Sequence, residues 1–157
     1  MAVQVAVCGP GECTGRERAE AREVGRLLAG RGAVVVCGGY GGVMAAVAAG
    51  ARSAGGVVVG VLSGADRAGA APDLTVALPT GLGQARNALI VNAADAVIVV
   101  GGSWGTLSEL AMAMRRGRVP VVQLGGWRVV DGDGRPLAGV RYAADPAEAV
   151  RLTGLWD

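Results

Sequence analysis

A short apolar run that ends in glycines decides the fold: AVVVCGGYGG, residues 33–42. Polar and apolar residues do not alternate within Ala33–Cys37, which is typical of a parallel strand that is covered on both faces. The glycines behind the run allow a sharp turn, and the apolar segment Val43–Ala54 has the length of a helix. The stretch therefore predicts a buried strand, a glycine turn and a helix in succession.

The same succession recurs along the rest of the chain. Further strands are predicted at Val3–Cys8, Val57–Leu62, Leu74–Leu78, Ala96–Val100, Val119–Leu124 and Val140–Ala143. Further helices are predicted at Gly15–Ala29, Gly83–Ala94, Thr106–Arg116 and Pro146–Leu152. Alternating strands and helices predict an α/β fold, a Rossmann-like doubly wound parallel sheet flanked by helices on both faces. Because no linker interrupts the chain, we expect a single domain over residues 1–157.

The composition excludes several kinds of chemistry. The chain has no His and no Lys, so all fifteen basic residues are Arg. Without His there is no Ser-His-Asp triad, and without Lys there is no Walker A loop and no Schiff base to pyridoxal phosphate. Any general acid or base must therefore be Asp, Glu, Cys, Tyr or a bound water.

Composition also limits the partners. The net charge is only +2, aromatic residues make up 3% of the chain, and no apolar stretch is long enough to span a membrane. We expect neither a nucleic acid nor a membrane as partner. The three cysteines include Cys8 and Cys13, whose spacing is poor for zinc, so we expect no metal and no permanent cofactor. The odd cysteine count and the absence of a signal peptide predict a cytoplasmic protein.

Three glycine-rich loops follow predicted strands, and in such sheets ligands bind beyond the carboxyl ends of the strands. Backbone N–H groups at the start of a helix bind phosphate well. These loops therefore predict a site for a phosphorylated small molecule. The predicted ligand-binding residues in the loops are Gly9, Gly38, Gly39, Gly41, Gly42, Gly102, Ser103, Gly105 and Thr106. A conventional NAD site is disfavoured, because Gly9–Thr14 lacks the third glycine of the fingerprint. A tight strand-to-helix turn is the alternative for that first loop.

Two charged residues stand beside these loops. Arg86 lies at the start of a predicted helix, where a cation opposes the helix dipole, and this misfit favours an anionic partner. The alternative is a solvated surface arginine. Glu109 is a candidate catalytic carboxylate, but Thr106-Leu107-Ser108-Glu109 also has the pattern of a capping box. In that alternative Glu109 would only bond to the Thr106 amide.

Together, these segments resemble the LONELY GUY superfamily, once labelled lysine-decarboxylase-like. The likeness is greatest to a small bacterial branch related to molybdenum cofactor carrier proteins, and it is carried by Gly38–Met44, Gly81–Asn87 and Gly101–Leu110. The superfamily's phosphoribohydrolase motif is an Arg followed by Pro-Gly-Gly-x-Gly-Thr-x-x-Glu. The Arg matches Arg86, and the Gly-Thr and Glu match Gly105-Thr106 and Glu109. Pro-Gly-Gly is replaced here by Gly101-Gly102-Ser103, and the usual Arg-Lys pair by Arg86-Asn87. The absence of lysine excludes the decarboxylase label.

The resemblance implies hydrolysis of a nucleoside 5′-monophosphate to the free base and ribose 5-phosphate. Arg86 would then orient the substrate, Asn87 would contact it, and Glu109 would stabilise the positive charge of an oxocarbenium-like transition state. No residue is clearly the acid that protonates the leaving base; Glu12 and Asp66 are candidates. The alternative is a non-catalytic carrier or sensor of a phosphorylated pterin such as molybdenum cofactor.

Self-association is predicted by two segments that are apolar nearly all round. These segments are Val43–Ala54 and Thr106–Met114. A helix of this kind in a small domain needs cover from another chain. We therefore expect a homodimer or a larger homo-oligomer, with the ligand cleft near the interface as in the superfamily that the chain resembles.

Overall fold

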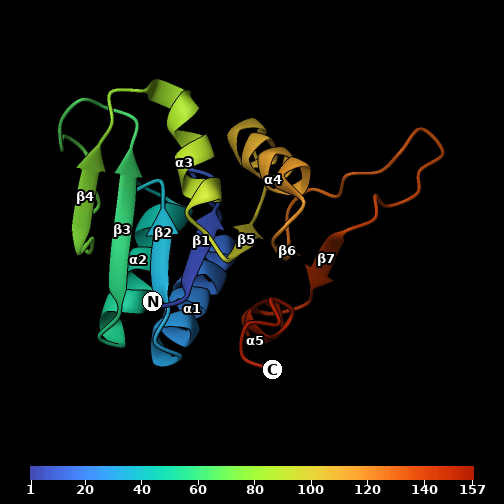
Figure 1. Cartoon of the computed structure of the whole chain (residues 1–157), viewed down its shortest axis with the longest axis horizontal. Coiled ribbons are helices and arrows are strands. Elements are labelled where there is room, and N and C mark those ends of the chain that lie inside the picture. Colours follow the sequence, from blue (N-terminus) through green and yellow to red (C-terminus); the bar gives the residue numbers. More distant parts are fainter.

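The computed structural model describes all residues, 1–157, and contains one seven-stranded sheet in the order β4-β3-β2-β1-β5-β6-β7 (Figure 1). Every neighbouring pair of strands is parallel. The strands are β1 Gln4–Cys8, β2 Val34–Cys37, β3 Val57–Leu62, β4 Val76–Pro79, β5 Ala96–Val100, β6 Val121–Leu124 and β7 Val140–Ala143. The chain winds outward from β1 in one direction and from β5 in the other, so the predicted doubly wound α/β fold is confirmed.

Helices cover both faces of the sheet (Figure 1). One layer consists of α1 Gly15–Gly30, α2 Val43–Ser53 and α5 Pro146–Arg151, which pack on one another through α1. The other layer consists of the 3₁₀ turn η1 Gly83–Arg86, α3 Asn87–Asn92 and α4 Trp104–Arg116. No helix in the molecule is long and apolar enough to cross a membrane.

The strands carry two cores, one on each face of the sheet. In β1, Val5 and Val7 belong to the core under α1 and α2, whereas Ala6 and Cys8 belong to the core under α3 and α4. All four side chains are buried. This explains why the strands read as unbroken apolar runs: both faces of each central strand are covered.

Helix α1 lies unusually close to α2, and two glycines make this possible. A Cβ on Gly25 would overlap the carbonyl of Val47, and a Cβ on Gly50 would overlap the carbonyl of Arg22. The apolar surface of α2 is therefore covered by α1 and the sheet within one chain. The expectation that α2 needs cover from a second chain is wrong for this reason.

Two predicted helices differ from the observed ones at their first turns. The predicted helix Gly83–Ala94 is a 3₁₀ turn followed by the short helix α3. Helix α4 begins at Trp104 rather than at the predicted Thr106, because the Ser103 side chain caps it. Thr14 and Glu17 form a capping box at the start of α1. A bridge between Val130 and Pro136 closes a turn in the long arm between β6 and β7 (Figure 1).

Candidate functional site

A cleft of about 250 Å³ opens at the carboxyl edge of the sheet, where the winding direction changes between β1 and β5. Ligands bind at such switch points in open α/β sheets. The cleft brings together seven of the residues predicted from the sequence: Gly9, Arg86, Asn87, Ser103, Gly105, Thr106 and Glu109. They come from the loop after β1, the η1–α3 segment and the first turns of α4.

Arg86 is buried and fixed in place, with only 6% of its surface exposed. Its Nε donates a hydrogen bond of 2.8 Å to the Val61 carbonyl, and Nη1 donates to Oδ1 of Asn87. A Cβ on Gly38 would lie 2.9 Å from Nη2, so the glycine makes room for the guanidinium. The solvated-surface interpretation of Arg86 is therefore wrong, and its charge lies at the cleft.

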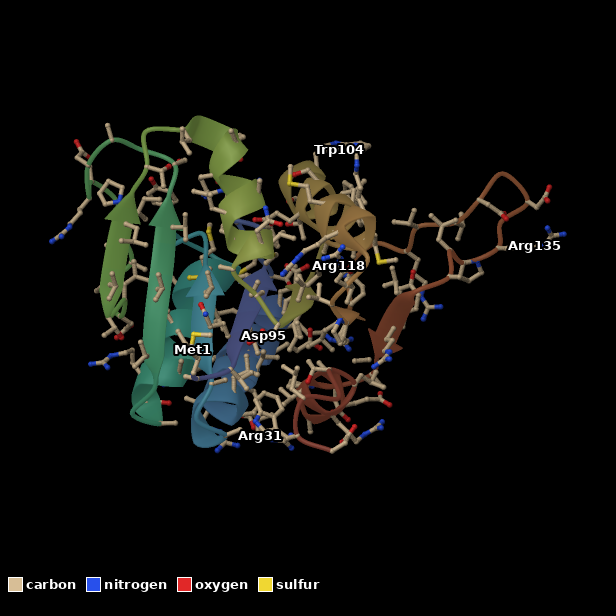
Figure 2. All side chains as sticks on the ribbon, in the orientation of Figure 1. Met1, Arg31, Asp95, Trp104, Arg118 and Arg135 are labelled. Carbon is tan, nitrogen blue, oxygen red and sulfur yellow. The ribbon has the colours of Figure 1, made fainter.

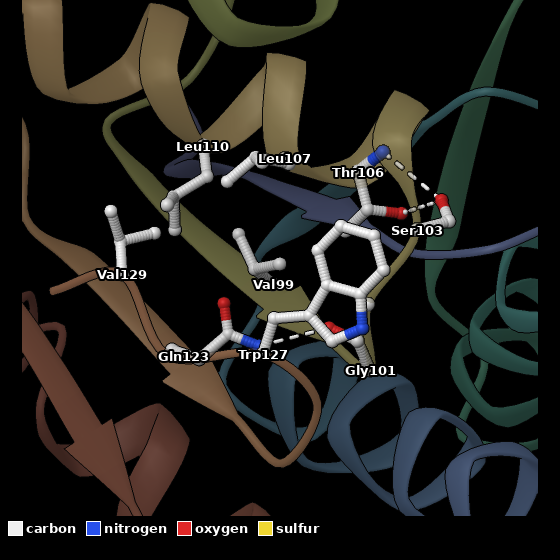
Figure 3. A pocket seen from close by; sticks show the side chains of 10 residues that line it. Val99, Gly101, Ser103, Thr106, Leu107, Leu110, Gln123, Trp127 and Val129 are labelled. Atoms are coloured by element: carbon white, nitrogen blue, oxygen red, sulfur yellow. Dashed lines mark hydrogen bonds between the residues drawn. The ribbon is translucent and has the colours of Figure 1, made fainter.

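Glu109 does not cap its helix. The N-cap of α4 is Ser103, whose Oγ accepts a hydrogen bond of 3.2 Å from the Thr106 amide and lies 2.8 Å from the Thr106 hydroxyl (Figure 3). Glu109 lies more than a turn further along and faces the cleft, with 8% of its surface exposed. The capping-box interpretation of Glu109 is wrong, because the helix begins before Thr106.

The surroundings of Glu109 favour a carboxyl group that holds its proton near neutral pH. Burial raises the pKa of Glu109 to about 7, while the positive charge of Arg86 and a hydrogen bond with Cys8 act in the opposite direction. Burial and the carboxylate of Glu109 raise the pKa of the Cys8 thiol. A carboxyl group in this state can donate a hydrogen bond or take up a proton near neutral pH.

The first turn of α4 forms the end of the cleft best suited to an anion. The backbone N–H groups of Trp104 and Gly105 lie in that turn and have no partner within the helix. Gly105 is exposed, and the nearest atom to a Cβ built on it is Ser103 Oγ at 3.9 Å. The side of the helix that faces the cleft is therefore open to a phosphate group.

Five predicted glycines lie outside the residues that line the cleft: Gly38, Gly39, Gly41, Gly42 and Gly102. Packing explains most of them. Gly42 has a positive φ of 60° and touches the Pro10 carbonyl, and Gly39 has a φ of 80° and abuts Leu62. Gly102 has no room for a side chain, because the indole of Trp127 would lie 2.8 Å from a Cβ built there. A direct ligand contact by these five stays a prediction.

Sequence reasoning missed several residues of the cleft, and Tyr40 is the most informative. It is the one aromatic residue in the glycine loop after β2. Phosphate binding by backbone N–H groups does not require an aromatic side chain, so its presence there was a separate signal in the sequence. Its hydroxyl accepts hydrogen bonds from the Gly64 amide at 3.0 Å and from the Ser63 hydroxyl at 3.4 Å. The other missed lining residues are Pro10, Gly11, Met44, Ser63 and Gln84.

The candidate acids and metal ligands do not gather at the cleft. Glu12 and Asp66 are exposed and are not among the lining residues. No group of three or more His, Cys, Asp or Glu residues is arranged to hold a metal ion, and all three cysteines are free. Apart from Glu109, no acidic side chain lines the cleft.

An open parallel sheet with a polar cleft at its switch point defines a Rossmann-like ligand-binding domain. Residues 2–150 match the family model of the SLOG cluster4 family, and the chain belongs to that family. A curated relative, an uncharacterized protein of Archaeoglobus fulgidus, is 42% identical over 135 residues, which cover 82% of this chain and 88% of the relative.

Two solved structures are similar over nearly their whole length. The molybdenum cofactor binding protein of the phototrophic bacterium Rippkaea orientalis is 31% identical with a TM-score of 0.87, covering 97% of this chain and 95% of the other. The molybdenum cofactor carrier protein of Chlamydomonas reinhardtii is 29% identical with a TM-score of 0.82, covering 96% and 95%. The chain is thus similar in sequence and fold to one protein named for binding molybdenum cofactor and one named for carrying it.

Proposed function

We propose that this protein binds and carries a phosphorylated pterin of the molybdenum cofactor type without hydrolysing it. The observation that carries the proposal is the whole-length likeness to two proteins named for binding or carrying that cofactor. The likeness extends over more than nine-tenths of the chain.

The chemistry of the cleft supports such a ligand. The anion-binding turn of α4 lies at one wall, and the phosphate would take the free N–H groups around Gly105. Arg86 adds a fixed positive charge. Tyr40 and Met44 are large, mainly apolar side chains in the lining, and they offer a surface on which a planar ring can lie. A protonated Glu109 can donate a hydrogen bond to a ring heteroatom.

One observation favours a second candidate, hydrolysis of a nucleoside 5′-monophosphate. Glu109 is buried in the cleft beside Arg86 rather than at a helix cap, as a catalytic carboxylate would be. Hydrolysis of a glycosidic bond also needs a group that protonates the leaving base, and no second carboxyl lines the cleft. The carrier is therefore the better supported of the two.

The two functions are separated by binding and turnover measurements on one ligand-free preparation. We expect saturable binding of the phosphorylated pterin by calorimetry, and no base release from AMP, CMP, GMP or UMP. Release of a base from any of these would favour the enzyme. In that case Glu109→Gln should lower the rate on the order of a hundredfold above pH 7, where Glu109 is ionised, because it removes the charge that faces the transition state. A carrier should keep its pterin affinity within a few-fold in the same variant.

A further inference from the structure

Three of the chain's five aromatic residues, Tyr40, Trp104 and Trp127, lie beyond the carboxyl ends of the strands. The chain has three Trp, two Tyr and no Phe. Tyr40 lines the cleft, and Trp104 begins the helix at its wall. Trp104 is 79% exposed, more than any other large apolar side chain except the terminal Met1 (Figure 2). An exposed tryptophan beside a ligand cleft indicates that something covers it in the functional state.

Trp104 does not stand alone. Its ring lies 5.0 Å from that of Trp127, at an interplanar angle of 77°, which is an edge-to-face contact. Trp127 is 42% exposed and packs against Gly102, whose missing side chain leaves space for the indole. We call Trp104 and Trp127 the aromatic platform. Its position is fixed by a helix start on one side and by a close backbone contact on the other.

The platform is continuous with the cleft. Ser103 and Gly105, the neighbours of Trp104, both line the cleft. Ser103 and Thr106 also border the small hollow beneath Trp127, so the same residues face both places. The free N–H groups of the first turn of α4 lie between them. A phosphate on this turn would therefore have the cleft on one side and the aromatic platform on the other.

We propose that the aromatic platform binds a second planar heteroaromatic ring, joined through a pyrophosphate to the ring in the cleft. The cargo is then the nucleotide-conjugated form of the phosphorylated pterin, an inference that rests on the proposed function. Nucleotide bases stack on exposed aromatic side chains whatever their identity. The linking pyrophosphate would cross the N-terminus of α4, where backbone N–H groups and the helix dipole favour negative charge.

Calorimetric titration with two pterin probes tests this. One probe is the pterin monophosphate, and the other is the same pterin conjugated to GMP through a pyrophosphate. In the native protein the conjugate should bind at least about tenfold more tightly, equivalent to about 1.4 kcal/mol. Trp104→Ala should abolish that preference by weakening the conjugate, because it removes the indole and keeps the backbone N–H of residue 104. Leu78→Ala is the control, because Leu78 is 46% exposed but lies on edge strand β4, across the sheet from β6.

Each other outcome overturns the inference. Equal affinity of the native protein for the two probes would remove the second ring from the platform while leaving the carrier function intact. The same holds if Trp104→Ala weakens both probes equally. If light scattering shows that Trp104→Ala dissociates an oligomer while the preference persists, a second copy covers the platform instead. If neither probe binds the native protein, the proposed function and this inference both fail.

Discussion

At the scale of the residue, the balance of burial and charge around Glu109 is the most consequential feature. The carboxyl is 8% exposed, and its pKa is about 7 although Arg86 lies close enough to oppose the shift. Desolvation therefore outweighs the attraction to the guanidinium, whose own hydrogen bonds go to Val61 and Asn87. Glu109 is thus a group that changes its protonation state near neutral pH.

This leads to a prediction about stability and pH. The folded protein holds the Glu109 proton up to about pH 7, whereas the unfolded chain loses it near 4.5. Because the folded state binds more protons in that window, the free energy of unfolding should fall as pH rises from 4.5 to 7. The loss has an upper bound of about 3.5 kcal/mol, at about 1.4 kcal/mol for each of the 2.5 pKa units. Glu109→Gln should remove this loss, and urea unfolding at pH 5 and pH 8 measures it.

The control for that experiment is Glu12→Gln, on an exposed loop outside the cleft. It should unfold like the native protein at both pH values, since exposed substitutions change stability little. If Glu109→Gln and the native protein lose stability in parallel between pH 5 and pH 8, Glu109 does not hold its proton in the folded state.

At the scale of the element, the start of α4 decides how the phosphate end of the site is built. We predict that Gly105→Val weakens binding of the pterin monophosphate at least about tenfold without unfolding the domain. A side chain there meets no atom closer than 3.9 Å, so the fold tolerates it, but it would cover the open turn. The helix-propensity cost of valine is below about 1 kcal/mol. Calorimetry and thermal melting measure the two effects separately.

A matched control exists in α1. Gly15 is also exposed in the first turn of its helix, and a Cβ there meets nothing within 4 Å. Gly15→Val should therefore show the same small stability change with native affinity. Equal affinities of Gly105→Val and Gly15→Val would place the phosphate elsewhere. Gly102 is a poor choice for this test, because a side chain there would displace Trp127 rather than block the cleft.

The elements also show how much of the structure could be predicted from the sequence alone. Strands β2, β3 and β5 were predictable because each is an apolar run with a glycine within two residues of its end, and Val57–Leu62 and Ala96–Val100 match the observed bounds. The start of α4 was not, because Ser103 and Thr106 are both acceptable N-caps and only the fold decides between them. The position of the N-cap determines whether Glu109 lies at the start of the helix or in the cleft.

Contacts between segments that are distant in the sequence account for the remaining differences between the predictions and the structure. The burial of Arg86 depends on the Val61 carbonyl, which lies in a strand distant in the chain. Nothing in the sequence around Gly25 and Gly50 indicated that these glycines allow α1 and α2 to pack closely. Trp127 covers Gly102 from a different loop. The sequence therefore indicated Arg86 and Glu109 as site residues, but not the residues that pack against them.

At the scale of the whole molecule, self-association remains a prediction, which now rests on α3 and α4 and no longer on α2. Helix α2 is covered within the chain, but α3 and α4 leave Leu89 and Met112 exposed at 45% and 37%. We expect a dimer or larger assembly through this face, and Met112→Glu should dissociate it because a charge would be buried. Light scattering at micromolar concentration measures the mass. A native monomer would contradict the prediction, and Leu78→Glu on β4 is the control.

The central claim is that the cleft at the switch point carries a phosphorylated pterin. It is tested most directly by identifying what the protein holds when it is purified from cells that make the cofactor. The bound molecule is released by denaturation, oxidised to a fluorescent pterin and identified by chromatography and mass spectrometry. The account predicts a phosphorylated pterin that is retained by the native protein and by Gly15→Val, and lost from Gly105→Val. A nucleoside monophosphate in the cleft, or no pterin in the native protein, would contradict it.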